Sequence, residues 1–299
     1  MYKQLKSKTI IGTWSLSGDY GHVNKLEIYK TLEYAIKNNF FEFDISPIYG
    51  KGKIENILSN VVRGIDKILI NTKCGYNNNF VKTFHPHDIT RSIQNSIEKF
   101  GKLNIVFLHN PRNEIKNWNK VIELLLEFKK IKLIKYIGLS VARDFYFEKK
   151  ILDSFDYIQD DINLLRTKPL LKLSSTKSKI IARSPLASGV LSGKLSLMTK
   201  FKKNDNRRNW LRSQRLKNIL EQIYQIKKIE KNDLRTFAIN FLFTIKKIDK
   251  IIFGVKNQKQ LENLKLNIKN FKTVKKNQAN KVFELNRNNF YLNNYSQGY

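Results

Sequence analysis

Short apolar runs alternate with longer amphipathic stretches along most of this chain. The runs are rich in Ile, Val, Leu and Phe, which favour strands, and turn residues follow many of them. Strands are expected near residues 9–13, 39–44, 67–73, 104–109, 133–140, 156–160, 179–184 and 250–254. Since helical stretches separate these runs, the pattern predicts repeated parallel crossover units. Eight such units close a parallel sheet, so the expected fold is α/β, an eight-fold (β/α)8 TIM barrel.

The stretches between the runs carry the period of a helix. In residues 116–128, five apolar side chains fall at i, i+3, i+4, i+7 and i+8, which predicts a single face against the core: Trp118, Val121, Ile122, Leu125 and Leu126. The gap between the seventh and eighth expected strands is much longer than the others and predicts two helices, residues 210–227 and 231–246. Long barrel loops usually shape a pocket.

Chain length and composition fit one domain. The 299 residues contain no Pro/Gly/Ser-rich linker, so residues 1–299 are expected to form a single barrel domain. It would carry a loop and helical insertion at about 195–247 and a C-terminal helix and tail at about 274–299. No run approaches the roughly 18 apolar residues of a membrane span, and the first residues lack the apolar segment of a secretory signal. A cytoplasmic location without membrane contact is therefore expected.

The chain is strongly basic, with a formal net charge of +31 and a pI near 10.0. A basic surface is the electrostatic footprint of nucleic-acid binding. Here, however, Lys and Arg are scattered along the chain and recur on the polar faces of the expected helices, which indicates solvated surface. The densest cluster, residues 200–215, is kept as a candidate contact for an anionic partner or substrate. No nucleic-acid partner is expected.

The cysteine and histidine positions predict no metal site. Cys74 is the single cysteine, which excludes an intrachain disulfide and a cysteine-rich metal site. Strand alternation points its side chain away from that of Lys73, so we expect it to pack in the core. His85 and His87 precede a helix expected to begin at Asp88 and, with no further ligand nearby, are interpreted as loop residues.

Four side chains stand at or just beyond the ends of three successive expected strands: Asp44, Tyr49, Lys73 and His109. In a parallel barrel that edge carries the chemistry. A phenol has a pKa of roughly 10, so Tyr49 needs a nearby cation to release its proton, and Lys73 could supply it while Asp44 offsets the burial of the ammonium. A neutral His109 could orient a substrate oxygen. Together they could protonate a carbonyl oxygen while hydride arrives at its carbon.

Six motifs, in order along nearly the whole chain, resemble the aldo-keto reductase family in its bacterial type. Phe43-Asp44-Ile45-Ser46-Pro47-Ile48-Tyr49-Gly50-Lys51-Gly52-Lys53-Ile54-Glu55 is similar to the family segment Asp-Thr-Ala-x-x-Tyr-Gly-x-Gly-x-Ser-Glu. Thr72-Lys73 and Leu108-His109-Asn110-Pro111 resemble the lysine and histidine strands of the family. The remaining similar segments are residues 136–140, 158–163 and 183–194, the last resembling the Ser-Pro-Leu-x-x-Gly-x-Leu-Thr-Gly-Lys loop. The catalytic tetrad of Asp, Tyr, Lys and His is complete.

The resemblance implies a nicotinamide dinucleotide, NADP with NAD as the alternative, although the chain has no Gly-x-Gly-x-x-Gly turn. The residues implied to hold it are Ser140, Gln159 and Asn163 at the carboxamide, Arg183 at the nicotinamide ring, Ser184, Leu186 and Ser188 along the pyrophosphate, and Gly254, Lys256 and Gln260 toward the adenosine end. A Lys256 cation would favour the 2′-phosphate of NADP over a hydroxyl. A solvated surface lysine is the alternative interpretation.

Some positions depart from the family pattern. Arg183 stands where many members have the aromatic that stacks on nicotinamide, and a planar guanidinium can also stack. Ile162 replaces a Tyr and Phe253 replaces a Pro, which leaves the adenine contacts open. Trp14, after the first strand, is expected to line the substrate pocket, with core packing as the alternative.

The sequence therefore predicts an NADP-dependent oxidoreductase that reduces an aldehyde or ketone to an alcohol, with Tyr49 as general acid. Its partner would be a small-molecule carbonyl or alcohol. Two alternatives stay open. One is a non-catalytic regulatory barrel that binds NADP and contacts a partner protein, and the other is a nucleic-acid-binding basic barrel, whose binding would weaken steeply with salt.

Overall fold

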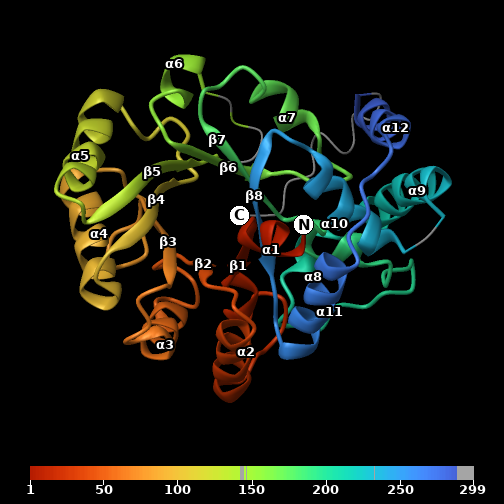
Figure 1. Cartoon of the computed structure of the whole chain (residues 1–299), viewed down its shortest axis with the longest axis horizontal. Helices are drawn as coiled ribbons and strands as arrows, with labels where there is room; N and C mark the ends of the chain where they lie inside the picture. Colours follow the sequence, from red (N-terminus) through yellow and green to blue (C-terminus); the bar gives the residue numbers. More distant parts are fainter. Residues whose placement is uncertain (142–144, 146, 232, 288–299) are drawn as a thin grey trace.

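Eight parallel strands close into a barrel in chain order (Figure 1). This computed structural model describes residues 1–141, 145, 147–231 and 233–287. The strands are β1 (Thr9–Gly12), β2 (Glu42–Asp44), β3 (Leu69–Cys74), β4 (Leu103–His109), β5 (Ile134–Ser140), β6 (Tyr157–Asp161), β7 (Lys179–Arg183) and β8 (Ile248–Gly254). The ring closes between β1 and β8, where Thr9 pairs with Ile251 and Gly12 with Gly254. The predicted (β/α)8 barrel is confirmed.

Helices surround the strands in Figure 1. They are α1 (Tyr2–Ser7), α2 (Lys25–Lys37), α3 (Lys53–Val62), α4 (Pro86–Phe100), α5 (Trp118–Lys130), α6 (Lys149–Leu152), α7 (Lys168–Lys172), α8 (Arg207–Trp210), α9 (Ser213–Ile229), α10 (Leu234–Thr244), α11 (Gln258–Lys269) and α12 (Lys276–Arg287), with the 3-10 helices η1 (Trp14–Leu16) and η2 (Ala187–Ser192). Side-chain caps start several of them, as Asn24, Asn117 and Asn257 each accept a backbone N–H of the first turn. None of the described helices is long and apolar enough to cross a membrane.

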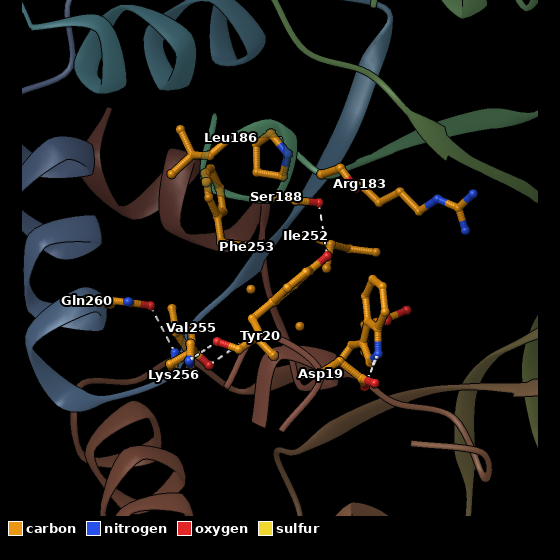
Figure 2. Close-up of a pocket in the computed structure, with 18 of the residues that line it drawn as sticks. Asp19, Tyr20, Arg183, Leu186, Ser188, Ile252, Phe253, Val255, Lys256 and Gln260 are labelled. Atoms are coloured by element: carbon orange, nitrogen blue, oxygen red, sulfur yellow. Dashed lines mark hydrogen bonds between the residues drawn. The ribbon is translucent and has the colours of Figure 1, made fainter. Parts of the chain in front are cut away.

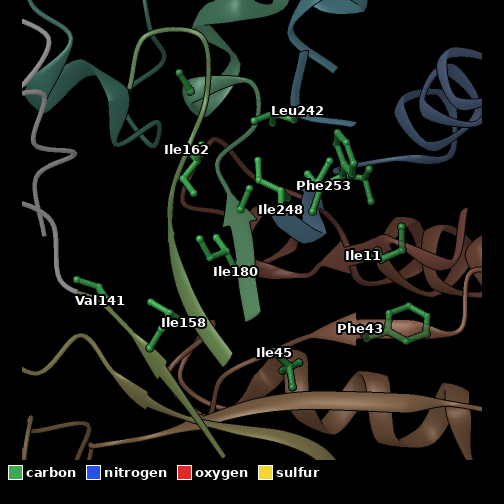
Figure 3. Packing of buried hydrophobic residues seen from close by; sticks show 14 of the residues in the cluster. Ile11, Phe43, Ile45, Val141, Ile158, Ile162, Ile180, Leu242, Ile248 and Phe253 are labelled. Carbon is green, nitrogen blue, oxygen red and sulfur yellow. The ribbon is translucent and has the colours of Figure 1, made fainter. Parts of the chain in front are cut away.

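The main core lies between the strands and the helices. Figure 3 shows the outward-facing strand side chains that fill it, among them Ile11, Phe43, Ile158, Ile180 and Phe253. Because successive strand residues point to opposite faces, the residues between these point into the barrel. The same strands therefore supply both the hydrophobic core and the lining of the barrel.

The barrel interior is layered. A middle layer of apolar side chains fills its centre: Ile10, Ile105, Phe107, Tyr157, Ile181 and Ile252. Toward the amino ends of the strands lies a polar group in which Glu42 pairs with Lys250 and accepts a hydrogen bond from Asn71. The apolar layer separates this group from the carboxyl ends of the strands, so chemistry at the carboxyl edge is insulated from the opposite end.

Helix α1 precedes β1 and buries Leu5. Two local expectations were wrong. Helix α4 begins at Pro86, because the imidazole of His85 accepts the backbone N–H of His87 as the N-cap. In α5, Leu126 is 43% exposed. The buried face of that helix is Val121, Leu125 and Phe128, since an i, i+4, i+7 stripe leaves position i+5 toward solvent.

The long connection between β7 and β8 contains α8, α9 and α10, one short helix more than the two expected. Helix α10 packs against β8 and η2. After β8, α11 and α12 complete the described chain, and Asn286 of α12 bonds the backbone of the β6–α7 loop at Leu164 and Thr167. The expected tail beyond residue 287 lies outside the described residues.

Adding a single methyl group at Gly138 should destabilise the folded protein. A Cβ at this position would lie 2.3 Å from Cδ1 of the Phe107 ring. Alanine ordinarily suits a strand interior better than glycine, so a loss can come only from this clash. We expect Gly138→Ala to lower the free energy of unfolding by about 2 kcal/mol, in the range of overpacked cores. Chemical denaturation measures it.

Phe107→Leu provides the matching control. If the clash is the cause, Gly138→Ala should cost less in the Phe107→Leu background than alone, because the shorter side chain leaves room. Equal costs in both backgrounds would contradict the packing explanation.

Candidate active site

A buried ion pair stands at the carboxyl edge of β2 and β3. Lys73 Nζ lies 2.7 Å from Asp44 Oδ1 and also donates to the Ile45 carbonyl oxygen at 2.9 Å. The two side chains are 1% and 6% exposed. Burial lowers the pKa of Lys73, and the Asp44 carboxylate opposes that shift. Removing either partner would leave a buried charge uncompensated, so each requires the other.

Tyr49 lies in the turn after β2, with its ring beside this pair. Lys73 Nζ is 5.0 Å from the centroid of the Tyr49 ring. Trp14, in η1, stacks on the other side at 6.4 Å between ring centroids. Burial raises the pKa of Tyr49 well above its usual value, the Asp44 carboxylate raises it further, and Arg183 opposes them. Tyr49 is therefore held protonated, the form that can donate a proton.

His109, the last residue of β4, faces the same place. Its Nδ1 is 3.3 Å from the Ser46 hydroxyl, and its ring meets the rings of Tyr49 and Tyr76 edge to face. Burial lowers the pKa of His109 well below its usual value, and the positive charges of Lys73, Arg183 and Lys82 add to the effect. The imidazole is therefore neutral at pH 7 and can exchange a hydrogen bond with a substrate oxygen.

A hydrogen-bonded chain leads from Asp44 across the next strands. Asp44 Oδ2 accepts Gln159 Nε2 at 2.9 Å, and the Ser140 hydroxyl donates to Gln159 Oε1 at 3.0 Å. Arg183 Nη1 donates in turn to the Ser140 hydroxyl at 3.0 Å. Side chains from β2, β5, β6 and β7 are thus fixed relative to one another at one edge of the barrel.

Arg183 is held at several atoms of its guanidinium. Nη1 also donates to Asn110 Oδ1 at 3.1 Å, Nη2 donates to the Val141 carbonyl oxygen at 2.9 Å, and Nε lies 3.2 Å from Asp161 Oδ1. Asn110 directly follows His109, and Asp161 ends β6. The guanidinium is therefore a fixed positive charge beside the tetrad.

Asp44, Tyr49, His109, Gln159 and Arg183 line one cavity of about 890 Å³ at the carboxyl edge of the barrel. It runs from Tyr49 and His109, past the β7 loop, to the end of β8 and α11. Figure 2 shows its far part, where Gln260 accepts the Lys256 backbone N–H at 3.0 Å and Lys256 Nζ donates to the Tyr20 carbonyl oxygen at 2.5 Å. A cavity of this size and length accommodates a large, extended ligand.

The loop that follows β7 (the β7 loop) forms part of the cavity wall and has an unusual backbone conformation. Ala187, Ser188 and Gly189 are three consecutive residues with positive φ, and Ser184 has positive φ as well. Left-handed backbone at non-glycine residues is costly and persists where the surrounding structure demands it, often at ligand sites. Successive N–H groups in such turns form concave anion-binding sites.

One contact crosses the cavity. The Tyr20 hydroxyl lies 2.9 Å from the Ser188 hydroxyl, joining the β1 loop to the β7 loop (Figure 2). Arg207 of α8, from the basic cluster at residues 200–215, lies over the Tyr20 ring and pairs with Asp205 at 2.6 Å. Part of that cluster therefore turns toward the pocket.

The structure brings most of the predicted site residues together. Those that line the cavity are Trp14, Asp44, Tyr49, His109, Gln159, Arg183, Ser184, Leu186, Ser188, Gly254, Lys256 and Gln260. Lys73 and Ser140 lie directly behind this lining, bonded to Asp44 and Gln159. Asn163 lies outside it, because its side chain donates to the Ser184 carbonyl oxygen and accepts the Leu165 backbone N–H, which supports the β7 loop.

The cavity wall also contains residues that the sequence analysis did not assign to the site, among them Tyr20 and Asp161. Arg207 lines it too, from the basic cluster that was kept as a candidate contact for an anionic partner or substrate. Asp161 had a usable signal, since it stands two residues after Gln159 on a strand and so shares its inward face. Tyr20 lies between β1 and α2, and Arg207 is the first residue of α8; no local pattern predicts that either would reach the cavity.

The single cysteine lies in the core. Cys74 is buried, its Sγ contacts the Phe107 carbonyl oxygen at 3.6 Å, and burial raises the pKa of its thiol to about 12. Its expected core packing is confirmed. Within the described ranges, no group of three or more His, Cys, Asp or Glu side chains is arranged to hold a metal ion.

Comparison with known proteins agrees with the fold. The family model "Aldo/keto reductase family" matches residues 8–287. The chain therefore belongs to the aldo/keto reductase family, whose members are oxidoreductases that act on carbonyl compounds. A comparison with curated protein sequences gives no significant match.

Solved structures with the same fold include a glycerol dehydrogenase, AKR11B4, from Gluconobacter oxydans, with 18% identity, a TM-score of 0.76, and coverage of 93% of this chain and 90% of that one. The aldo-keto reductase AKR11C1 from Bacillus halodurans, in its holo form, has 14% identity, a TM-score of 0.76, and coverage of 93% and 91%. A thermostable aldo-keto reductase, Tm1743, in complex with the inhibitor epalrestat, has 18% identity, a TM-score of 0.65, and coverage of 93% and 94%. At these sequence identities, the similarity to the three solved structures shows a shared fold alone.

The buried His109 should make the protein more sensitive to acid. An unfolded histidine takes up a proton below about pH 6.5, whereas the lowered pKa of His109 prevents this in the folded state. The unfolded state then binds more protons, so stability falls as pH falls. We expect His109→Gln to lose less unfolding free energy than the wild type between about pH 7.5 and about pH 5, measured by denaturant titration.

His87→Gln is the control, because His87 is 65% exposed. This variant should retain the acid sensitivity of the wild type. If His109→Gln loses as much stability on acidification as the wild type does, the buried neutral imidazole is not a source of acid sensitivity.

Proposed function

We propose that this protein is an NADP-dependent reductase that converts an aldehyde or ketone to an alcohol, with Tyr49 as general acid. The observation that carries the proposal is the placement of a protonated Tyr49 beside the buried Lys73–Asp44 pair and the neutral His109, all at one end of the long cavity. Carbonyl reduction requires the protein to supply a proton donor, a neutral group that orients the substrate, and a fixed ion pair.

In this proposal His109 donates or accepts a hydrogen bond at the substrate oxygen and orients the carbonyl, and Trp14 and Tyr76 enclose the substrate. The Tyr49 hydroxyl gives its proton to the carbonyl oxygen, which becomes the alcohol hydroxyl. A reduced nicotinamide, when bound, supplies the hydride that adds to the carbonyl carbon. The phenolate left on Tyr49 regains a proton from solvent after product leaves.

The cavity fits a dinucleotide. Gln159 offers an amide in the cavity wall next to the tetrad, as a carboxamide requires, and Ser140 holds it from behind. The left-handed turn at Ala187, Ser188 and Gly189 suits a pyrophosphate. At the far end Lys256, with Gln260 fixing its backbone, offers a cation for a 2′-phosphate. Asn163 would act indirectly, by supporting the β7 loop through Ser184.

Replacing the general acid tests the reaction. We expect Tyr49→Phe to reduce kcat for NADPH-dependent carbonyl reduction by about a hundredfold or more, because general acid catalysis contributes about 10²–10⁴-fold. NADPH consumption against a panel of aldehydes and ketones measures it.

NADPH binding, followed by nicotinamide fluorescence, should stay within about threefold of wild type. Tight NADPH binding by the wild type without turnover of any carbonyl would support the regulatory barrel instead. The absence of both binding and turnover would refute the cofactor assignment.

A second substitution tests the choice of cofactor. Lys256→Met should raise the KM for NADPH by about tenfold or more, the value of one charge-assisted hydrogen bond. The KM for NADH should change little, since NADH lacks the 2′-phosphate. Lys269→Met removes an exposed charge outside the cavity lining and serves as the control for net charge. Equal changes for both cofactors would contradict a role for Lys256 at the phosphate.

A further inference from the structure

Helix α12 is attached to the barrel by a buried side chain in its last turn. Asn286 is 6% exposed. Its Oδ1 accepts the Thr167 backbone N–H at 3.1 Å, and its Nδ2 donates to the Leu164 and Val282 carbonyl oxygens at 2.8 and 2.9 Å. An amide that is buried with both its nitrogen and its oxygen bonded specifies one arrangement, because burying it without partners would be costly.

The β6–α7 loop (residues 162–167) that Asn286 holds is folded back on itself. Asn163 and Arg166 exchange two backbone hydrogen bonds, at 2.9 and 3.2 Å. Arg166 Nε donates to the Asp161 carbonyl oxygen at 3.2 Å, and its guanidinium lies 3.7 Å from the Asp160 carboxylate. The β6–α7 loop is therefore anchored to β6 at one side and to α12 at the other.

This loop is joined in turn to the end of β7 and the start of the β7 loop. The Ile162 backbone N–H donates to the Arg183 carbonyl oxygen at 3.2 Å. Asn163 Nδ2 donates to the Ser184 carbonyl oxygen at 3.0 Å, while its Oδ1 accepts the Leu165 backbone N–H at 3.0 Å. The side chain that supports Ser184 is therefore itself fixed within the β6–α7 loop.

The β7 loop requires such support. Ser184 has a φ of 54°, and Ala187, Ser188 and Gly189 have φ values of 47°, 57° and 89°. Left-handed backbone at non-glycine residues is costly and persists only where the surrounding structure holds it. Ser184 and Ser188 also line the cavity. A change in this support would therefore reach the cavity wall directly.

Helix α12 is attached at two separate places. Near its first turn, Gln278 Nε2 donates to the Ile229 carbonyl oxygen at 3.3 Å and to the Glu230 carboxylate at 3.0 Å, which joins α12 to the end of α9. In its last turn Asn286 joins it to the β6–α7 loop, and Figure 1 shows α12 between α7 and α9. None of the residues of α12 lines the cavity. The two attachments can be removed one at a time.

We propose that Asn286 is a positioning residue for the dinucleotide: by fixing the β6–α7 loop, it keeps Asn163 bonded to Ser184 and so holds the β7 loop in the conformation that forms the pyrophosphate wall. The inference rests on the proposed function for its effect on NADPH. It gives α12 a role in ligand binding without any contact between α12 and the ligand.

Hydrogen exchange of the protein alone tests the path. The backbone N–H groups of Ala187, Gly189 and Leu191 are bonded within the β7 loop, so their exchange reports how firmly it is held. We expect Asn286→Ala to speed exchange in residues 184–193 by about fivefold or more, the value of one hydrogen bond. Gln278→Ala, which removes the other attachment of α12, should leave that segment near the wild-type rate. An unchanged rate in Asn286→Ala, or equal increases in both variants, would overturn the inference.

Asn163→Ala interrupts the path one step closer to the β7 loop. It should speed exchange in residues 184–193 to a similar extent while exchange in residues 276–287 of α12 stays at the wild-type rate. If Asn286 acts through Asn163, Asn286→Ala should add little in the Asn163→Ala background. Additive effects of the two substitutions would contradict the path, and this comparison remains decisive if Asn286→Ala loosens α12 as a whole.

NADPH binding tests the consequence. For Asn286→Ala we expect the Kd for NADPH, followed by nicotinamide fluorescence, and the KM for NADPH to rise by about fivefold, with kcat for carbonyl reduction within about twofold of wild type. Gln278→Ala should change none of these values. A fall in kcat with an unchanged KM would overturn the positioning role. If the wild type bound no NADPH, the proposed function would fail, whereas the exchange rates would still decide whether Asn286 holds the β7 loop.

Discussion

The site depends on the buried pair of Asp44 and Lys73. Because Asp44 pairs in register with Asn71, Lys73 stands two residues further along β3 and reaches back over the end of β2 to the carboxylate. Two opposite charges at 2.7 Å can be buried together, whereas either alone would be costly. Burying them also fixes the surroundings, since Gln159 bonds the second oxygen of Asp44 and Thr13 bonds its carbonyl oxygen. Strands β1, β2, β3 and β6 are thereby joined at the edge where Tyr49 sits.

Side chains alternate along each strand, so that one set packs in the core and the other set lines the barrel interior and the candidate site. Outward residues such as Ile11, Phe43 and Ile180 build the core against the helices, and inward residues build the layered interior. In β4, Ile105 and Phe107 fill the interior while His109, two residues further, belongs to the site. The residues of the candidate site thus stand on a rigid, close-packed base, which holds them in fixed positions.

The effect of each basic residue in this protein depends on where its side chain lies. Many of its basic residues lie on the surrounding helices, where salt screens those that are exposed. A few turn inward: Lys73 is neutralised by Asp44, Arg183 is held beside Asp161, and Arg207 and Lys256 face the middle and far end of the cavity. A cation with fixed geometry in a water-poor site acts far more strongly than one at the surface. Net charge alone could not distinguish these roles.

The sequence determined the barrel and predicted which four side chains would meet at its carboxyl edge, because strand period, turn residues and motif order are local or linear properties. Asp44, Tyr49, Lys73 and His109 could be grouped because parallel strands bring their carboxyl ends to one edge. Tertiary structure decided the rest. Leu126 turned to solvent and α1 formed before β1, since burial depends on what packs opposite. The Asn163 side chain supports the β7 loop through the Ser184 carbonyl oxygen. Tyr20 enters the cavity wall where its hydroxyl meets that of Ser188 and its backbone pairs with Asp205. These two contacts of Tyr20 join residues more than a hundred positions apart, follow from the closed fold and leave no periodic signal in the chain.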